Sequence, residues 1–178
     1  MDTLLHRKYL TLMQIVLGII FKQTWIMFIA VTIANAFILK SRAKEYIAKN
    51  PDLKKGYENL FKGIIFFGNI PWTIIAIGNL SGMTNSIFDF FNPRSMNPVV
   101  LTFHASIIAL WILSVYWIYF RNGAAFLERH PGLIRRRGFN GNSDVTAKQI
   151  KIFFPLMLLG GIAGMIMMWN MKIPTPIF

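Results

Sequence analysis

Four long stretches without an acidic or basic residue constrain this chain most, at residues 23–39, 63–80, 99–120 and 152–171. A helix that crosses a bilayer needs roughly 17–25 predominantly apolar residues, and all four stretches reach that length. Charged residues make up 15% of the chain, against about 25% in soluble domains. We therefore expect an all-α membrane protein in which residues 23–178 form a bundle of four transmembrane helices.

Basic residues concentrate in two of the segments between these stretches. Residues 40–62 and 121–151 hold seven Lys or Arg residues each, 14 of the chain's 19, whereas residues 81–98 hold one. Cytoplasmic loops of membrane proteins carry an excess of Lys and Arg. The pattern predicts that 40–62 and 121–151 are cytoplasmic loops and that the C-terminus lies outside. We expect an inner membrane of the bacterial type.

The net charge of +12 and the absence of cysteine bear on which partners and which kinds of site the chain can have. In a soluble protein such a charge would suit nucleic acid, but here it lies between apolar stretches, so no nucleic-acid partner is predicted. Without cysteine the chain has no disulfide, thiolate metal site or thiol nucleophile.

Residues 1–22 have the pattern of an amphipathic helix with a narrow polar stripe. The polar residues recur every three or four positions, at Thr3, Arg7, Thr11, Gln14, Gly18 and Lys22. Such a helix suits a membrane interface or a partner surface. A fifth span is the competing interpretation, but it would leave only Lys22 and Gln23 for the turn. We therefore predict an interfacial helix.

Polar side chains within apolar stretches are the first candidates for a functional site, because burying them in lipid is costly. The candidates are Asn35, Asn69, Thr73, Asn79, His104 and Ser114. Asn35, Asn69 and Ser114 fall at similar depths near the predicted cytoplasmic side. They indicate either a small cavity or hydrogen bonds that hold the helices together.

His104 is the only histidine within a stretch. A proton or substrate role and a plain interhelical hydrogen bond both remain open for it. Haem would need a second axial ligand at a matching height, and His6 and His130 lie outside the stretches. No cofactor and no metal site are predicted.

Small residues four positions apart allow close helix contacts. Two glycine pairs have this spacing, Gly160 with Gly164 and Gly78 with Gly82. The pattern leaves open whether the partner helix is internal or belongs to another subunit. Arg135, Arg136 and Arg137 are candidates for contact with anionic lipid headgroups.

Motifs for catalysis are missing: there is no HExxH, no G-x-S-x-G and no phosphate-binding Gly-rich loop. No apolar stretch holds Asp or Glu. The sequence favours a non-catalytic membrane protein, either an accessory subunit of a larger complex or a small homo-oligomer. Its partners would be the bilayer with its anionic headgroups and other membrane subunits or further copies. The alternative is a channel or carrier for a small neutral or anionic solute, and a lipid-acting enzyme ranks third.

Overall fold

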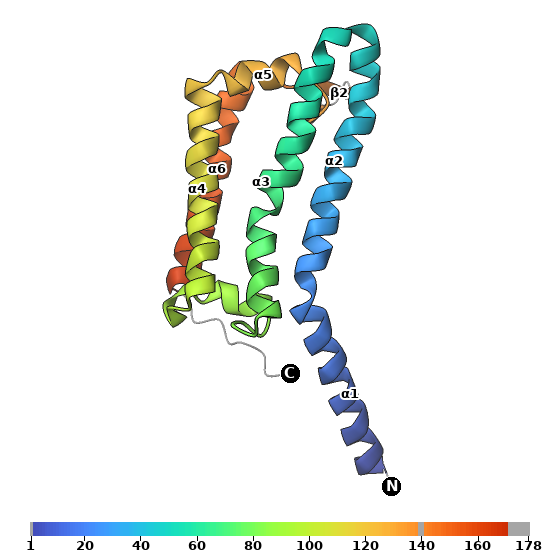
Figure 1. Cartoon of the computed structure of the whole chain (residues 1–178), viewed down its shortest axis with the longest axis vertical. Helices are drawn as coiled ribbons and strands as arrows, with labels where there is room; N and C mark the ends of the chain where they lie inside the picture. The colour runs from blue at the N-terminus through green and yellow to red at the C-terminus, as the bar shows by residue number, and fades with distance from the viewer. Residues whose placement is uncertain (1, 139–140, 171–178) are drawn as a thin grey trace.

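The chain folds mostly into helices, as the computed structural model shows for the backbone of residues 2–138 and 141–170 (Figure 1). Side chains are described for residues 12–134 and 144–170. In chain order the elements are α1 (Asp2–Lys22), α2 (Thr24–Lys49), η1 (Pro51–Leu53), α3 (Lys54–Leu80), η2 (Ile87–Phe91), η3 (Pro93–Ser95), α4 (Pro98–Phe120), α5 (Gly123–Arg129), β1 (Arg135–Gly138), β2 (Gly141–Asp144) and α6 (Ala147–Asn170).

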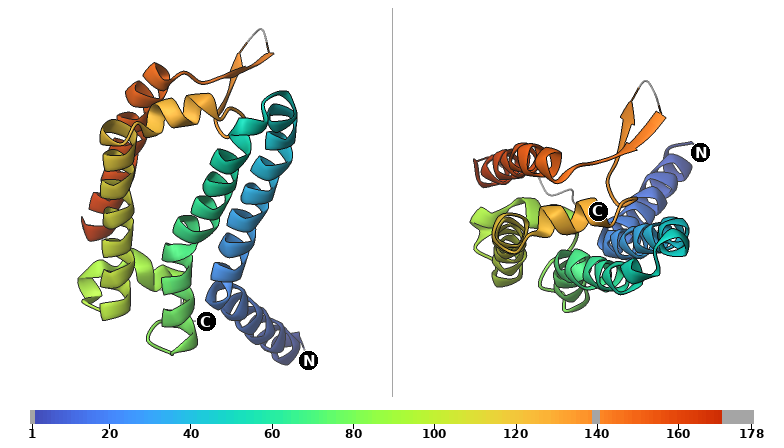
Figure 2. Two further views of the ribbon diagram at one scale, coloured as in Figure 1. Left: turned by 45° about the horizontal axis from the view of Figure 1, so that its top comes forward. Right: turned by 90° about the horizontal axis from the view of Figure 1, so that it is seen from above.

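Four helices, α2, α3, α4 and α6, are long and apolar enough to cross a membrane. They contain 26, 27, 23 and 24 residues. At 1.5 Å per residue they are about 35–40 Å long, which exceeds the roughly 30 Å of a hydrocarbon core. The predicted helical class with four apolar helices is confirmed. The helices form two pairs, α2 with α3 and α4 with α6 (Figures 1 and 2). Towards η2, α3 also packs against α4 through a core of Ile75, Phe90, Val100 and Phe103.

Residues 40–62, expected as a loop between two spans, are mostly helical. Helix α2 continues to Lys49 and α3 begins at Lys54, so only a short connection separates them. Ala, Lys, Arg and Glu are strong helix formers, and loss of apolar character therefore does not end a helix. The helix stops at Asn50, whose side chain accepts a hydrogen bond from the Asp52 N–H, just before a proline.

Residues 121–151 are also more ordered than a loop. They contain α5, a two-stranded antiparallel hairpin and the start of α6. In the hairpin, Arg135 lies opposite Asp144 and Gly138 opposite Gly141. This hairpin departs from the purely helical expectation, because the short polar strands carry no hydrophobic period that would predict them.

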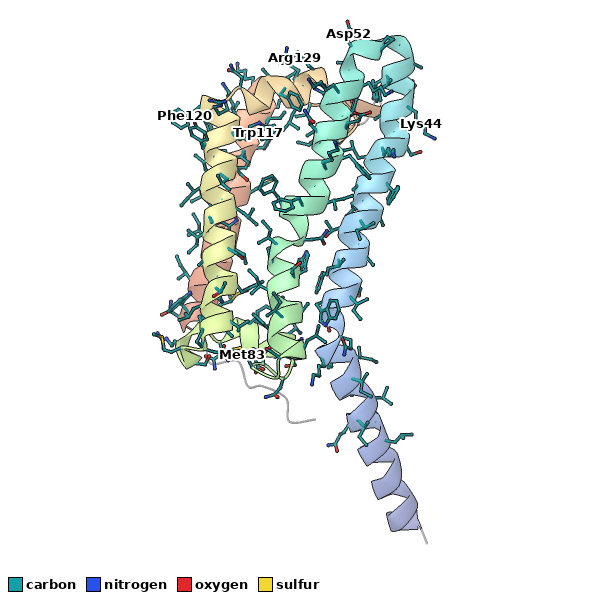
Figure 3. The ribbon with its side chains drawn as sticks, in the orientation of Figure 1. Lys44, Asp52, Met83, Trp117, Phe120 and Arg129 are labelled. Carbon is teal, nitrogen blue, oxygen red and sulfur yellow. The ribbon has the colours of Figure 1, made fainter. Side chains whose placement is uncertain are left out.

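The two predicted basic segments meet at one end of the bundle, which we call the basic end. It holds the end of α2, the start of α3, α5 and the start of α6 (Figures 1 and 3). Lys44 and Arg129 lie there, both with exposed side chains. The opposite end holds η2 and η3, and we call it the loop end.

Helices α2 and α3 pack closely along their length. Leu39, Ala43 and Tyr57 form a buried cluster near the basic end. Towards the loop end, Phe28 stacks on Trp72 with ring centroids 4.2 Å apart. Pro71 lies inside α3 without ending it, as neighbouring helices permit.

Helix α5 links the α4–α6 pair to the α2–α3 pair at the basic end (Figure 2). The buried His130 directly follows α5, and its ring lies 5.1 Å from that of Tyr57 in α3. The Tyr57 hydroxyl donates a 2.7 Å hydrogen bond to the carbonyl of Pro131. On the other side of α5, Ala124 packs against Ile118 and Ile150. This contact network joins the two pairs at the basic end.

Helix α1 projects away from the bundle beyond the loop end, at an angle to α2 (Figures 1 and 2). Its large apolar side chains are about half exposed, at Leu12, Met13, Ile15, Val16, Ile19 and Ile20. At the end of the helix, Phe21 meets Phe88 with ring centroids 5.0 Å apart. The helix therefore offers an apolar surface that the rest of the described chain leaves uncovered.

Candidate functional site

The six polar candidates do not converge on one site. Asn35 and Thr73 are exposed on the outside of the bundle. Ala36 is fully buried, and the next position along a helix turns by 100°, so Asn35 is directed outward. Ser114 is half-buried on α4. A cavity shared by Asn35, Asn69 and Ser114 is therefore not formed within this chain.

Asn69 is half-buried, and its side chain bonds its own helix. The Asn69 Nδ2 donates a 2.7 Å hydrogen bond to the carbonyl of Ile65. Its Oδ1 is buried and has no hydrogen-bond partner in the described part of the chain. One amide oxygen facing an apolar surrounding is too little to bind a solute alone.

Asn79 is 1% exposed and joins three segments at the loop end. Its Nδ2 donates to the Lys22 carbonyl at 2.7 Å, and its Oδ1 accepts from the Thr84 hydroxyl at 2.7 Å. The amide thus gives the last carbonyl of α1 a hydrogen-bond donor and holds the turn that follows α3 in place. Both hydrogen-bonding ends are used, so Asn79 has a structural role.

His104 is 2% exposed and lies on α4 close to the loop end. Its Nε2 is 2.9 Å from the carbonyl of Phe90, and because a carbonyl only accepts, Nε2 carries the proton. The Nδ1 atom is buried and has no partner among the described residues. The ring also contacts Trp169 of α6, with centroids 6.1 Å apart. These contacts hold η2 and α6 against α4.

Of the glycine pair at 78 and 82, Gly78 lies at a close contact between α3 and α4, and Gly82 lies in a turn. A Cβ on Gly78 would lie 2.7 Å from Thr84 Oγ1 and 2.8 Å from Val99 Cγ1, so this glycine admits the returning chain. Gly82 lies after α3 with a φ of +73°, a left-handed conformation that favours glycine. The pair combines one close approach with one turn.

Gly160 and Gly164 have no internal partner in the described chain. A Cβ on either residue would meet no heavy atom within 4 Å. The glycine of α6 that makes room for α4 is Gly161, where a Cβ would lie 2.8 Å from the Trp111 ring. The sequence pattern had not singled out Gly161. Contact with another chain remains a prediction.

An apolar groove between α4 and α6 was not anticipated from the sequence. Its volume is about 420 Å³, and its wall runs along α4 from Ile108 to Phe120 and along α6 from Leu158 to Ile162. Trp111 forms part of the wall because Gly161 admits its ring. Both walls are uniformly apolar in sequence, so no polar signal marked the groove.

The side chains of Arg135, Arg136 and Arg137 lie outside the described residues, and their backbone forms β1 at the basic end. Among the described residues, no three His, Cys, Asp or Glu side chains could hold a metal ion. The absence of a cofactor stays a prediction. Hydrogen-bonded polar groups and apolar surfaces are the chemistry that this arrangement offers.

Comparisons with protein-family models, with curated proteins and with solved structures found no match.

Proposed function

We propose that the chain is a multi-pass integral membrane protein with a non-catalytic role. It would be an accessory subunit of a larger membrane complex or a small homo-oligomer. Four helices of spanning length support this proposal. So do the large exposed apolar side chains along them, among them Phe66 at 67% and Met157 at 70%. Such surfaces are costly in water and suit lipid or another helix.

The uncovered face of α6 is the observation that supports contact with another subunit. No residue in the most apolar 18-residue part of α6 is buried. On that helix Gly160 and Gly164 form a small-residue surface with nothing within 4 Å of an added Cβ. Small residues let two helix backbones approach closely in lipid, where close packing drives association. We propose that another transmembrane helix packs on this face.

The orientation is proposed from the clustering of charge. Lys and Arg from two separate segments lie together at the basic end, which supports placing that end in the cytoplasm of a bacterial-type inner membrane. Helix α1 then leaves the opposite end as an interfacial helix. Its exposed apolar side chains and oblique direction support that position.

The channel and enzyme alternatives receive less support. A solute path needs polar groups that face a common space. Here Asn35 and Thr73 face outward, Asn79 is fully hydrogen-bonded, and the groove beside α4 is apolar. A polar path would have to be assembled from several copies of the chain.

Affinity purification from native membranes in a mild detergent tests the proposal. We expect the tagged wild-type chain to retain other membrane subunits or further copies of itself. The variant Gly164→Leu should lose them while melting at nearly the wild-type temperature, because no internal atom opposes the new side chain. The matched variant Gly161→Leu should lower the melting temperature instead, since it displaces Trp111.

Two outcomes would contradict the proposed subunit contact. One is a monomeric wild-type chain with no co-purified protein. The other is unchanged association of Gly164→Leu. Solute flux through vesicles that contain only this chain would favour the channel.

A further inference from the structure

The groove between α4 and α6 faces away from the rest of the bundle. On α4, Val100, Phe103 and Ile107 pack with the core shared with α3. Ile112, in the groove, lies about 140° around the helix from Ile107 at 100° per residue. Phe120, at the basic end of the groove, is directed away from α3 (Figure 3). If the helices cross a membrane, the groove opens to lipid.

The groove has the length of one leaflet. From Ile108 to Phe120 the helix rises about 18 Å, at 1.5 Å per residue, against about 15 Å for half of a hydrocarbon core. Beyond Ile108 the two helices close on each other, where His104 contacts Trp169 and Arg94 Nη2 donates to Asn170 Oδ1 at 3.4 Å. A spanning partner helix would need the full depth of the bilayer. A single acyl chain needs only this half.

Positive charge lies at the open, basic end of the groove. Lys151 and Leu158 are seven residues apart and therefore share a face of α6, and Leu158 is part of the groove wall. The Tyr119 hydroxyl donates a 2.7 Å hydrogen bond to the Lys151 carbonyl, which places Lys151 level with the end of α4. The side chains of Lys148 and Lys151 are both exposed. The two lysines thus supply positive charge at the end of α6 that lies nearest the groove.

We propose that the groove binds an acidic phospholipid, with one acyl chain along α4 and α6 and the phosphate near Lys148 and Lys151. The apolar wall, the one-leaflet length and the charge at one end together match this occupant. The inference rests on the proposed membrane insertion. It assigns a particular lipid site, distinct from the arginines of β1.

Native mass spectrometry of the purified chain in a neutral detergent tests the site. The probes are dioleoyl phosphatidylglycerol and dioleoyl phosphatidylcholine, which differ only in their headgroups. We expect one retained phosphatidylglycerol per chain and weaker retention of phosphatidylcholine. The double variant Lys148→Gln/Lys151→Gln should lower the affinity for phosphatidylglycerol about fivefold per lysine, because each basic residue contributes about that factor at an anionic surface.

The double variant Lys54→Gln/Lys55→Gln is the matched control. It removes the same charge from exposed lysines at the same end of the molecule, on α3. Its affinity for phosphatidylglycerol should remain that of the wild type. An equal loss in both double variants, or no loss in either, would overturn the headgroup site.

Filling the groove tests the acyl chain. Ile112 is 63% exposed, so Ile112→Trp is expected to fold, and its ring should displace either lipid. The control Ile38→Trp places the same ring on an exposed position of α2 and should leave lipid retention unchanged. Unchanged retention in Ile112→Trp would overturn the proposed groove site, and so would a lipid-free dimer in the wild type.

Membrane insertion is measured separately, by extraction of native membranes with alkaline carbonate. Release of the chain by carbonate would overturn insertion and with it the proposed function. An inserted chain without a preference for phosphatidylglycerol would overturn only the lipid site.

Discussion

The α2–α3 pair and the α4–α6 pair contain helices of similar length, yet they pack very differently. Helices α2 and α3 contact each other from Phe28 and Trp72 to Ala43 and Tyr57, over most of their length. Helices α4 and α6 meet at both ends and at Trp111, and a groove of about 420 Å³ runs beside that contact.

The connections between the helices account for part of this difference. A few residues around η1 join α2 to α3, so the two helices must run side by side from the turn onward. Helix α5 and the β hairpin separate α4 from α6. Helix α5 packs on α4 and α6, and the residues that follow it, His130 and Pro131, contact α3. Packing between α4 and α6 therefore depends on local side chains such as Trp111. Helices that are loosely paired keep surfaces for lipid and for other subunits.

The largest expected effect is a difference in cysteine labelling between the basic end and the loop end. Lys49 ends α2 at the basic end, and Ser95 lies in η3 at the loop end. Because the chain has no native cysteine, Lys49→Cys and Ser95→Cys provide clean labelling sites. We expect an impermeant maleimide to label Ser95→Cys in intact cells and Lys49→Cys only after the inner membrane is opened. The reverse pattern would invert the proposed orientation.

The second prediction breaks the contact between the pairs at the basic end. A Cβ on Gly56 would lie within the His130 ring, whose Nδ1 is held 2.8 Å from the Phe126 carbonyl. The clash should destabilise Gly56→Ala by about 3 kcal/mol, the upper end of overpacking costs. Better helix propensity offsets only about 1 kcal/mol. Thermal melting in detergent measures the change.

The control for this prediction is Gly63→Ala. It is the same substitution on the same helix, where an added Cβ meets nothing within 4 Å. Its melting temperature should equal or exceed that of the wild type. If Gly56→Ala melts like Gly63→Ala, the docking of His130 on α3 is wrong.

The third prediction concerns the end of the tightly packed pair. Asn79→Ala removes the donor to the Lys22 carbonyl and the acceptor of the Thr84 hydroxyl. Buried groups left without partners cost about 1–3 kcal/mol, so the melting temperature should fall. A spin label at Gln14→Cys on α1 should become more mobile. Asn35→Ala, at an exposed position, should change neither measurement.

The smallest effect separates two neighbouring glycines of the loosely packed pair. In Gly161→Ala the new Cβ pushes on Trp111, and we expect a loss of about 1 kcal/mol. In Gly160→Ala the new Cβ has no heavy atom within 4 Å. The better helix propensity of alanine should therefore stabilise the chain by up to about 1 kcal/mol. Melting in detergent should therefore rank Gly160→Ala above Gly161→Ala. Equal melting would mean that Trp111 does not hold α6.

The sequence alone determined the helical class and the positions of the four apolar helices, because long uncharged runs have few other stable arrangements. It also located the two basic segments. Its helix boundaries were less accurate, since basic residues such as those between Lys40 and Lys49 favour helix as strongly as apolar ones do.

Only the tertiary structure decided which residues meet. It directed Asn35 and Thr73 outward, joined Asn79 to α1, selected Gly161 rather than Gly160 for the contact with α4, and opened the groove beside Trp111. The physical reason is rotation about the helix axis: one residue turns a side chain by 100°. A helix that is apolar on every side does not reveal in its sequence which face is buried.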